Sequence, residues 1–213
     1  MPRRCWTPKE VEKLGAVAPD FFLFLAMRTI LGNPLLRFLL TAFLLYITWY
    51  LVYELWIHPA RWLDDTVIRS LEWMTSGLLV ALGFELIPDS IDQSIRTVGI
   101  DGTNGLWIGD NCDGIILFVL FTVFVVAYPG AIKRKLWFIP LGLLTIHLLN
   151  VLRILALTLI IYYFPDPEVL DFNHTYTFQA IVYAYVFFLW YLWANKLSGK
   201  GGLNPPEAAA GDA

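Results

Sequence analysis

The sequence predicts an all-α integral membrane protein: a bundle of about six transmembrane helices, with a small extracytoplasmic β-hairpin before the helix that starts at Gly114. Of the 213 residues, 58% are hydrophobic and only 15% are charged, and the mean hydropathy is +0.61. A soluble domain of this length carries far more surface charge. The length allows about five or six spans of roughly 20 residues each. We expect residues 1–203 to form a single multi-span membrane domain and residues 204–213 to be a disordered tail, because the tail is rich in Pro, Ala and Gly.

Several other classes of protein are excluded. The basic start of the chain precedes an apolar stretch, as in a signal peptide, but Asp20 and Arg28 interrupt that stretch and no small-x-small cleavage site follows, so we expect it to be retained. The two cysteines, Cys5 and Cys112, are too few for a disulfide framework. Neither a zinc-type Cys/His spacing nor a glycine-rich phosphate loop occurs. We therefore expect no cofactor, no metal and no nucleic-acid partner, and membrane lipid as the surroundings.

Six segments are candidate spans. Four are long enough to cross a bilayer unaided: Leu35–Ile57, Thr66–Ile87, Gly114–Gly130 and Leu136–Phe164. A fifth, Phe178–Ala194, is rich in Tyr, Trp and Phe, as expected where a helix approaches the membrane interface. The sixth, Val17–Gly32, is short and contains two charged residues. It either spans or lies along the membrane surface as an amphipathic helix.

The longest polar stretch, Pro88 to Asp110, lies between the second and third of the unaided spans. Within it, the extended runs Arg96–Ile100 and Leu106–Ile108 flank the sequence Asp101-Gly-Thr-Asn-Gly. Two short extended runs around a Gly/Asn/Asp turn predict a small β-hairpin.

Basic residues orient the predicted bundle. The turn 133–135 reads Lys-Arg-Lys, whereas the stretches Pro88–Asn111 and Pro165–Asn173 are acidic. The positive-inside rule places the Lys-Arg-Lys turn and the C-terminus in the cytoplasm and both acidic stretches outside. A cytoplasmic basic N-terminus requires an odd number of crossings before the first acidic stretch, which favours Val17–Gly32 as a span and six spans in all. A five-span chain with an external N-terminus is the alternative.

Three polar side chains fall at one predicted depth. Counted from the basic cytoplasmic ends of their spans, Cys112 is 21 positions away, Arg153 is 18 and His174 is 22. At a helical rise of ~1.5 Å per residue, these separations are about 31, 27 and 33 Å. A hydrocarbon core is about 30 Å thick. We therefore expect a thiol, a guanidinium and an imidazole from three segments to meet at the outer interface.

Cys112 lies in the polar junction Asp110-Asn-Cys-Asp-Gly at the start of a span. Cysteine is often a small apolar filler in helices, but a helix N-terminus stabilises a thiolate and lowers its pKa. The neighbouring Asp113 acts in the opposite direction, since a second negative charge raises the pKa of the thiol. Cys5, in a polar tail, has no partner in view and no predicted role.

Arg153 interrupts an otherwise apolar helix, where arginine costs at least a few kcal/mol to insert and is a functional candidate by default. Its alternative is snorkelling to the outer headgroups. Asn150, one turn earlier, can share its face and hydrogen-bond across the bundle. His174 precedes a span on an acidic loop, where a solvated histidine is the alternative. His147 is predicted to be a packed or networked polar group, and His58 to have no role.

Together, Cys112, Arg153 and His174 make a set for nucleophilic catalysis. A cysteine attacks, a histidine takes its proton and later protonates the leaving group, and an arginine stabilises the oxyanion. An acidic residue is not required, although Asp110, Asp113 or Asp171 could orient the imidazole.

The motifs Asn111-Cys112-Asp-Gly114-Ile, Asn150-Val-Leu-Arg153-Ile and Asn173-His174, in this order, resemble those of the exosortase/archaeosortase family. The resemblance covers roughly Ile100 to Lys196. It implies a multi-span cysteine transpeptidase with Cys112 as nucleophile, Arg153 as the stabilising cation and His174 as base. The motif residues that would support the site are Asn111, Gly114 and Asn150.

The resemblance also implies a substrate and a location. Members of this family recognise exported proteins that carry a C-terminal sorting signal, which consists of a short motif, a transmembrane helix and a basic cluster. They cleave near the motif on the outer face and pass the acyl group to a surface acceptor. The implied location is a bacterial inner membrane or archaeal plasma membrane, with the active site on the periplasmic or extracytoplasmic face.

A different class of function is the alternative: a non-catalytic membrane scaffold or transport component in surface-polymer export. The Trp- and Tyr-rich spans could then pack against partner helices, with the charged residues holding helices together. Labelling of Cys112 by an external maleimide separates the two, since a reactive, accessible thiol favours the enzyme. A cytoplasmic-facing acyltransferase would require the inverted topology.

Overall fold

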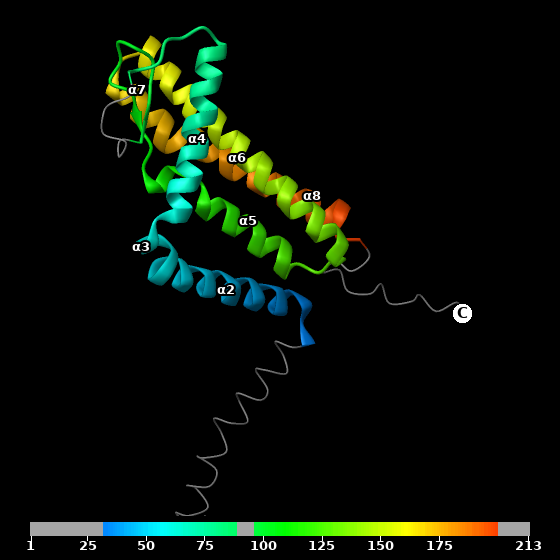
Figure 1. Ribbon diagram of the computed structural model, residues 1–213. Coiled ribbons are helices and arrows are strands. Elements are labelled where there is room, and N and C mark those ends of the chain that lie inside the picture. The colour runs from blue at the N-terminus through cyan, green and yellow to red at the C-terminus, as the bar shows by residue number, and fades with distance from the viewer. Residues whose placement is uncertain (1–31, 89–95, 200–213) are drawn as a thin grey trace, which may run out of the picture.

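The computed structural model describes residues 32–88 and 96–199, and this part of the chain is almost wholly helical (Figure 1). The α-helices are α2 (Pro34–Val52), α3 (His58–Ala60), α4 (Trp62–Ala81), α5 (Ile115–Ala127), α6 (Ile132–Tyr163), α7 (Pro167–Phe172) and α8 (Phe178–Leu192). Short π-helical turns at Tyr53–Ile57, Asn173–Thr177 and Trp193–Leu197 extend α2, join α7 to α8 and end α8. The predicted segment Val17–Gly32 and the predicted disordered tail, 204–213, lie outside the described residues.

Three continuous helical segments of the described chain are long and apolar enough to cross a membrane: Pro34–Ala60, Ile132–Tyr163 and Pro167–Leu197. They overlap three of the predicted spans, Leu35–Ile57, Leu136–Phe164 and Phe178–Ala194. α5 is a fourth, shorter apolar helix. The chain is therefore a helical membrane protein, as the composition predicts.

The predicted spans Gly114–Gly130 and Thr66–Ile87 differ from the helices found. α5 has only 13 residues, because Gly114 before it is left-handed and Tyr128, the residue before a proline, is extended with ψ 137°. α4 has four charged residues within its 20, so it is not among the helices apolar enough to span. The depth calculated for Cys112 thus assumed more helix than α5 contains.

α2, α5, α6 and α8 form the body of the bundle, with α2 beside α5 and α6 beside α8 (Figure 1). Phe38, near the start of α2, contacts the rings of Phe124 and Tyr128 at the end of α5, so the two helices are antiparallel. A buried cluster rich in aromatic rings, which we call the bundle core, joins α5, α6 and α8. It consists of Leu117, Phe121, Val125, Tyr128, Phe138, Ile146, Val182, Val186, Leu189 and Trp193.

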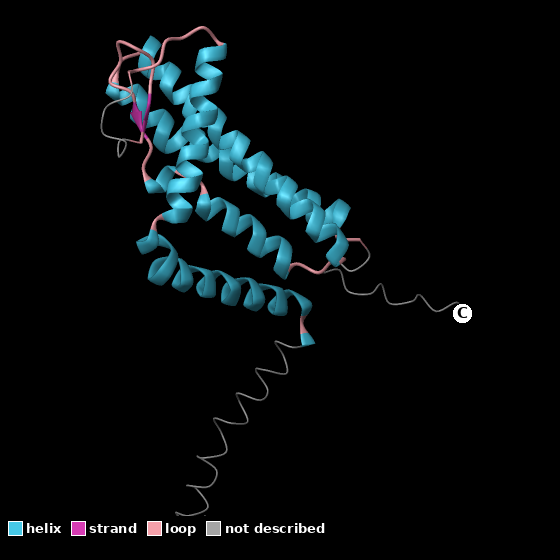
Figure 2. Cartoon of the chain, viewed as in Figure 1, coloured by secondary structure: helices cyan, strands magenta, loops and turns pink. Residues whose placement is uncertain are grey.

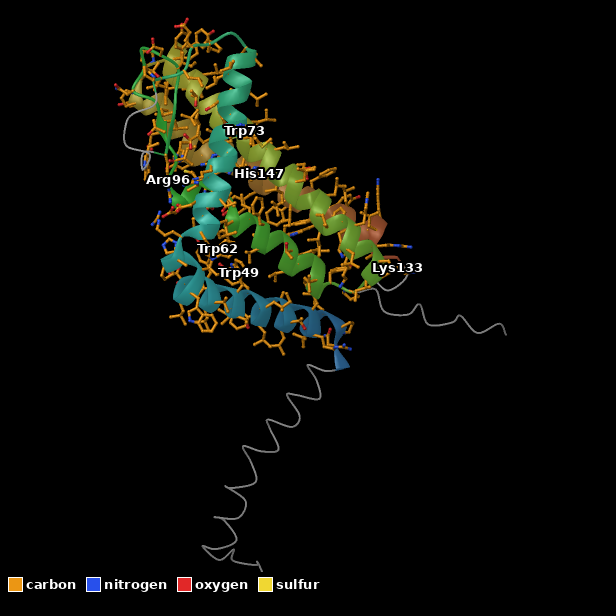
Figure 3. The ribbon with its side chains drawn as sticks, in the orientation of Figure 1. Trp49, Trp62, Trp73, Arg96, Lys133 and His147 are labelled. Atoms are coloured by element: carbon orange, nitrogen blue, oxygen red, sulfur yellow. The ribbon has the colours of Figure 1, made fainter. Side chains whose placement is uncertain are left out.

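α4 crosses α6 and follows a different course from the predicted Thr66–Ile87 span. It begins beside the turn that leads into α5, and the segment after it brings the ring of Phe84 to 5.5 Å from that of Tyr162, at the end of α6. α4 therefore does not return to the end of the bundle that carries Lys133, which lies far from it in Figure 3.

The predicted β-hairpin is present. β1 (Thr97–Val98) pairs antiparallel with β2 (Leu106–Trp107) around the predicted Gly/Asn/Asp turn, and a bridge from Leu86 to Ile100 adds the segment after α4 (Figure 2). Together with α4 and the second half of α6, the hairpin encloses a purely aliphatic cluster, which we call the cap core. It consists of Ile68, Leu71, Leu79, Val98, Ile100, Ile108, Val151 and Ile154.

Candidate active site

Cys112 is the last residue of a 3₁₀ turn, Asp110–Cys112, that leads into α5. Its N–H donates to the carbonyl of Gly109 at 2.9 Å, which closes the turn. Gly114 then takes a left-handed conformation with φ 85°, which few other residues adopt without strain. A Cβ at this position would also lie 3.2 Å from the side-chain amide of Asn150. The glycine that the motif predicted is thus required by both backbone conformation and space.

Asn150 ties the turn that carries Cys112 to α6. Its Nδ2 donates to the carbonyl oxygens of Cys112 at 2.8 Å and Asp113 at 3.0 Å, and the side chain is 1% exposed. A buried side-chain bond to two consecutive carbonyls fixes the position of the chain at the thiol. The predicted hydrogen bond of Asn150 across the bundle is confirmed. The side chain of Asn111, the other predicted supporting amide, lies outside the described part of the structure.

The thiol of Cys112 meets the imidazole of His174, with Sγ 3.2 Å from Nε2. His174 lies in the π-helical turn between α7 and α8, and α7 is held at its start by Asp166, whose side chain accepts from the N–H of Glu168 at 2.9 Å. Arg153 of α6 reaches the same place, where Nη2 lies 3.5 Å from the carbonyl oxygen of His174. The structure therefore brings the three predicted residues together from three separate segments.

Burial raises the pKa of the Cys112 thiol above its ordinary value. The Arg153 guanidinium and a backbone hydrogen bond from Gly109 lower it, and Asp113 raises it further. The predicted lowering of the pKa by the helix N-terminus is therefore outweighed by desolvation. A thiol with a raised pKa needs a nearby base to become a nucleophile, and the Nε2 of His174 is within reach of its proton.

None of the three carboxylates proposed to orient the imidazole bonds to it among the described residues. Asp171 instead accepts from the hydroxyl of Thr175 at 3.4 Å. Asp110 pairs with Arg96 and with Arg61, whose Nη2 is 3.2 Å from Oδ1. Burial alone would raise the pKa of Asp110, but the hydrogen bond from Arg96 and the two guanidinium charges lower it.

Asp113 turns the other way, toward a set of residues that the sequence analysis did not identify. Asp64 of α4 is fully buried and accepts a hydrogen bond from the hydroxyl of Tyr53. The Nδ1 of His58 lies 3.8 Å from Asp64 Oδ2 and 3.4 Å from that hydroxyl. His58, predicted to have no role, is thus part of this network. The feature of the sequence that could have revealed this network is the pair of adjacent aspartates, Asp64 and Asp65, at the start of an apolar segment.

His147, predicted to be a packed or networked polar group, is both. Its Nε2 lies 2.9 Å from the hydroxyl of Ser70 on α4, and its ring packs against Phe118. In Figure 3 it lies between the end with Arg96 and the end with Lys133. It ties α4 to α6.

A cavity of about 340 Å³ lies beside Arg153, which lines it. Cys112 and His174 are not among the lining residues, but Asp110 and Asp113, close to Cys112 in the chain, are. The lining residues are Asp110, Asp113, Gly114, Ile116, Leu117, Arg153, Gln179, Val182 and Tyr183. The cavity thus has acidic groups and a guanidinium at one end and apolar side chains of α5 and α8 along its walls.

Comparison with known proteins assigns the chain to a family. The sequence model of the family described as transmembrane exosortase matches residues 9–194. No curated protein and no solved structure matches the chain. Within the described residues, no group of three His, Cys, Asp or Glu side chains is arranged to hold a metal ion. Because the match covers nearly the whole chain, including the turn with Cys112 and the helix with Arg153, this protein belongs to the transmembrane exosortase family.

Proposed function

We propose that this exosortase is a membrane cysteine peptidase or transpeptidase that cleaves the C-terminal sorting signals of exported proteins. The observation that carries the proposal is the contact between Cys112 Sγ and His174 Nε2 at 3.2 Å, beside the guanidinium of Arg153 and next to a cavity. A thiol, a base and a permanent cation in this arrangement are the groups that acyl transfer requires.

Each group has one role in the reaction. The Nε2 of His174 takes the proton of the Cys112 thiol, and the thiolate attacks the scissile carbonyl of the substrate. Arg153 stabilises the oxyanion, since its fixed fork has donors to spare beyond the long contact to the His174 carbonyl. The C–N bond then breaks, the departing amine takes the proton from His174, and the substrate's acyl group remains on sulfur as a thioester.

The second half of the reaction releases the acyl group. An acceptor amine or water gives a proton to His174 as it attacks the thioester carbonyl. The carbon–sulfur bond breaks, and the thiolate regains the proton from the imidazole. With an amine the outcome is transpeptidation, and with water it is hydrolysis.

Helix lengths suggest how the bundle sits in a membrane. α6 has 32 residues, which is about 48 Å at ~1.5 Å per residue, longer than a hydrocarbon core of about 30 Å. If Lys133 marks the cytoplasmic boundary, Arg153 lies about 30 Å away, near the outer one. We infer that α2, α6 and α8 cross and that α5, whose 13 residues span about 20 Å, crosses together with the chain on either side of it. α4, the hairpin and the last turns of α6 then form a cap outside.

This topology needs one crossing before the hairpin, by α2, and keeps the start of α2 in the cytoplasm with Lys133. The four spans α2, α5, α6 and α8 therefore already satisfy the positive-inside rule, from which the sequence analysis predicted six. The cavity then lies at the outer leaflet, where the motif of an exported protein, which precedes its transmembrane helix in the chain, would emerge from the bilayer. We place the protein in a bacterial inner membrane with this face in the periplasm.

The test is co-expression with a tagged exported protein that ends in a motif, an apolar helix and a basic cluster. Cys112→Ala is expected to abolish processing of the tagged protein, while Cys5→Ala, which removes the other cysteine, leaves it unchanged. Processing that persists in Cys112→Ala would overturn the proposal and favour the non-catalytic scaffold. External maleimide labelling of Cys112, in a Cys5→Ala background, reports the side of the membrane separately.

A further inference from the structure

Two buried carboxyl groups lie behind the turn that carries Cys112. Asp113 follows Cys112 in sequence and is 3% exposed, and Asp64 of α4 is 0% exposed. The two side chains are close enough for a hydrogen bond to act between them, yet Oδ2 of each is buried with no donor among the described residues. Two carboxylates cannot hydrogen-bond to each other while both are ionised, because each offers only acceptors. A single proton between them would supply the missing donor.

The hydrogen bonds around the pair indicate which group carries the proton. Asp64 Oδ1 accepts from the hydroxyl of Tyr53, and the Nδ1 of His58 lies 3.8 Å from its other oxygen, so groups that can stabilise a negative charge lie near both oxygens of Asp64. Asp113 Oδ1 accepts only the N–H of Ile115, at 2.8 Å. No N–H or O–H of the described residues donates to Oδ2 of either group. A proton on Asp113 Oδ2, donated to Asp64, satisfies both of these buried oxygens.

We propose that Asp113 and Asp64 share one proton, and that this proton keeps the position next to Cys112 uncharged so that the thiolate can form. An ionised Asp113 would place a second negative charge beside the thiolate. With the proton in place, the negative charge of the pair lies on Asp64, whereas Asp113 is the one of the two whose charge raises the pKa of the thiol. Both are positioning residues, since they act on Cys112 through the local field. The proposal rests on the nucleophilic role of Cys112 for its consequence but not for its geometry.

Burial first, and then the Asp64 carboxylate, raise the pKa of Asp113 to about 7. As pH rises through this value, the shared proton is lost and the field at Cys112 becomes more negative. The other titratable or charged groups that face the pair and Cys112 are Tyr53, His58, Arg61, Asp65, Arg96, Asp110, Arg153 and His174. Four arginine–carboxylate ion pairs lie among them, because Arg61 and Arg96 each contact both Asp65 and Asp110.

The experiment measures the rate at which iodoacetamide alkylates Cys112 as a function of pH, in the purified full chain with Cys5→Ser. In wild type, the logarithm of the alkylation rate is expected to rise less steeply with pH around pH 7, where the pair ionises. We call this change of slope the break. Asp113→Asn keeps the hydrogen bond to Asp64 with an amide donor, so its profile should lack that break. Its rate should match wild type at about pH 6 and exceed it roughly tenfold at about pH 9, the effect of one pKa unit.

Asp64→Asn is expected to behave differently. The amide in Asp64→Asn can donate to the carboxylate of Asp113, which favours its ionised form, so the pKa of Asp113 should fall and alkylation at about pH 6 should be slower than in wild type, by up to roughly tenfold. Asp101→Asn removes an exposed carboxylate in the hairpin turn and should leave the profile unchanged. A wild-type profile without the break, or a break that persists in Asp113→Asn, would overturn the proposal.

An infrared measurement on wild type needs no substitution at the pair. With aspartate labelled by ¹³C at the carboxyl carbon, a carbonyl band of protonated aspartic acid should be present at about pH 6 and disappear as pH rises through about 7. The absence of such a band at about pH 6 would overturn the shared proton. Both readouts are independent of substrate cleavage. A break in the alkylation profile together with normal processing by Cys112→Ala would therefore support the shared proton and contradict the role of Cys112 as nucleophile.

Discussion

The two buried clusters of this molecule differ in composition and in the helices that form them. The bundle core joins α5, α6 and α8 and stacks aromatic rings, such as Phe138 on Trp193 with centroids 5.3 Å apart. The cap core lies under α4 and the hairpin and contains only Ile, Leu and Val. In a bilayer, helices associate through packing and hydrogen bonds and gain nothing from water exclusion. Outside it, aliphatic burial is driven by the hydrophobic effect. The proposed topology places the bundle core in the bilayer and the cap core in water.

α6 belongs to both clusters, and the candidate site lies where it passes from one to the other. Ile146 is in the bundle core and Val151 and Ile154 are in the cap core, with Asn150 and Arg153 between them. Each side supplies part of the site. The bundle holds Arg153 and His174, whereas α4 in the cap supplies Asp64 behind the thiol. The polar groups of the site are thus concentrated where the two cores meet, and several of them are buried there.

The largest effect is expected at the bundle side of the site. Arg153→Lys should lower the rate of substrate cleavage by roughly 10²–10³, because an ammonium cannot reproduce the guanidinium fork toward the oxyanion. Processing is measured on the tagged sorting-signal substrate at matched expression. Turnover close to wild type would show that Arg153 only anchors α6 at the interface.

The two cores should respond differently to the same deletion. Leu71→Ala in the cap core should lower the free energy of unfolding by about 2–4 kcal/mol, the usual range for a buried leucine. Leu189→Ala in the bundle core removes the same atoms but should cost less, since unfolded helices stay in lipid or detergent. Thermal unfolding in one detergent compares them, and an equal or larger loss in Leu189→Ala would contradict the assignment of two solvents.

At the boundary, Asn150→Ala should destabilise the protein by about 1–3 kcal/mol, because two buried carbonyls lose their donor. It should also lower cleavage at least tenfold, since the turn with Cys112 is no longer fixed. Ser70→Ala is the matched control: it breaks a different hydrogen bond of α6, the one between His147 and Ser70 of α4, and should reduce stability while leaving cleavage near normal. Equal losses of activity in both variants would mean that Asn150 acts only through stability.

The smallest effect concerns pH. The pKa of Asp113 is raised in the folded protein to about 7, so between about pH 4 and pH 7 the folded state holds a proton that the unfolded state has lost. This contribution to stability is full at low pH and is lost as pH rises through about 7. From about pH 5 to pH 7, wild type should therefore lose about 1–2 kcal/mol relative to Asp113→Asn. The difference between the two melting curves measures it, and parallel curves would show that Asp113 ionises normally.

Some residues of the site and some elements of the fold could be predicted from the sequence, and others could not. Cys112, Arg153 and His174 were predictable because each interrupts or ends an apolar run, and depth along a helix is a local count. The hairpin was predictable from its turn. The course of α4 was not, since the hydropathy of Thr66–Ile87 does not distinguish a span from a helix packed on the outer part of another. Asp64 was missed for the same reason, because its role depends on a contact between segments 49 positions apart in the chain.

The most direct test of the account is the chemical state of Cys112 during turnover. The purified protein is mixed with a peptide that carries a sorting signal, quenched in acid and analysed by intact-mass spectrometry with peptide mapping. The account predicts a thioester between Cys112 and the N-terminal part of the peptide, released by hydroxylamine and lacking in Cys112→Ala. Cleavage of the peptide by Cys112→Ala at an undiminished rate would contradict the account. An adduct on a residue other than Cys112 would contradict it too.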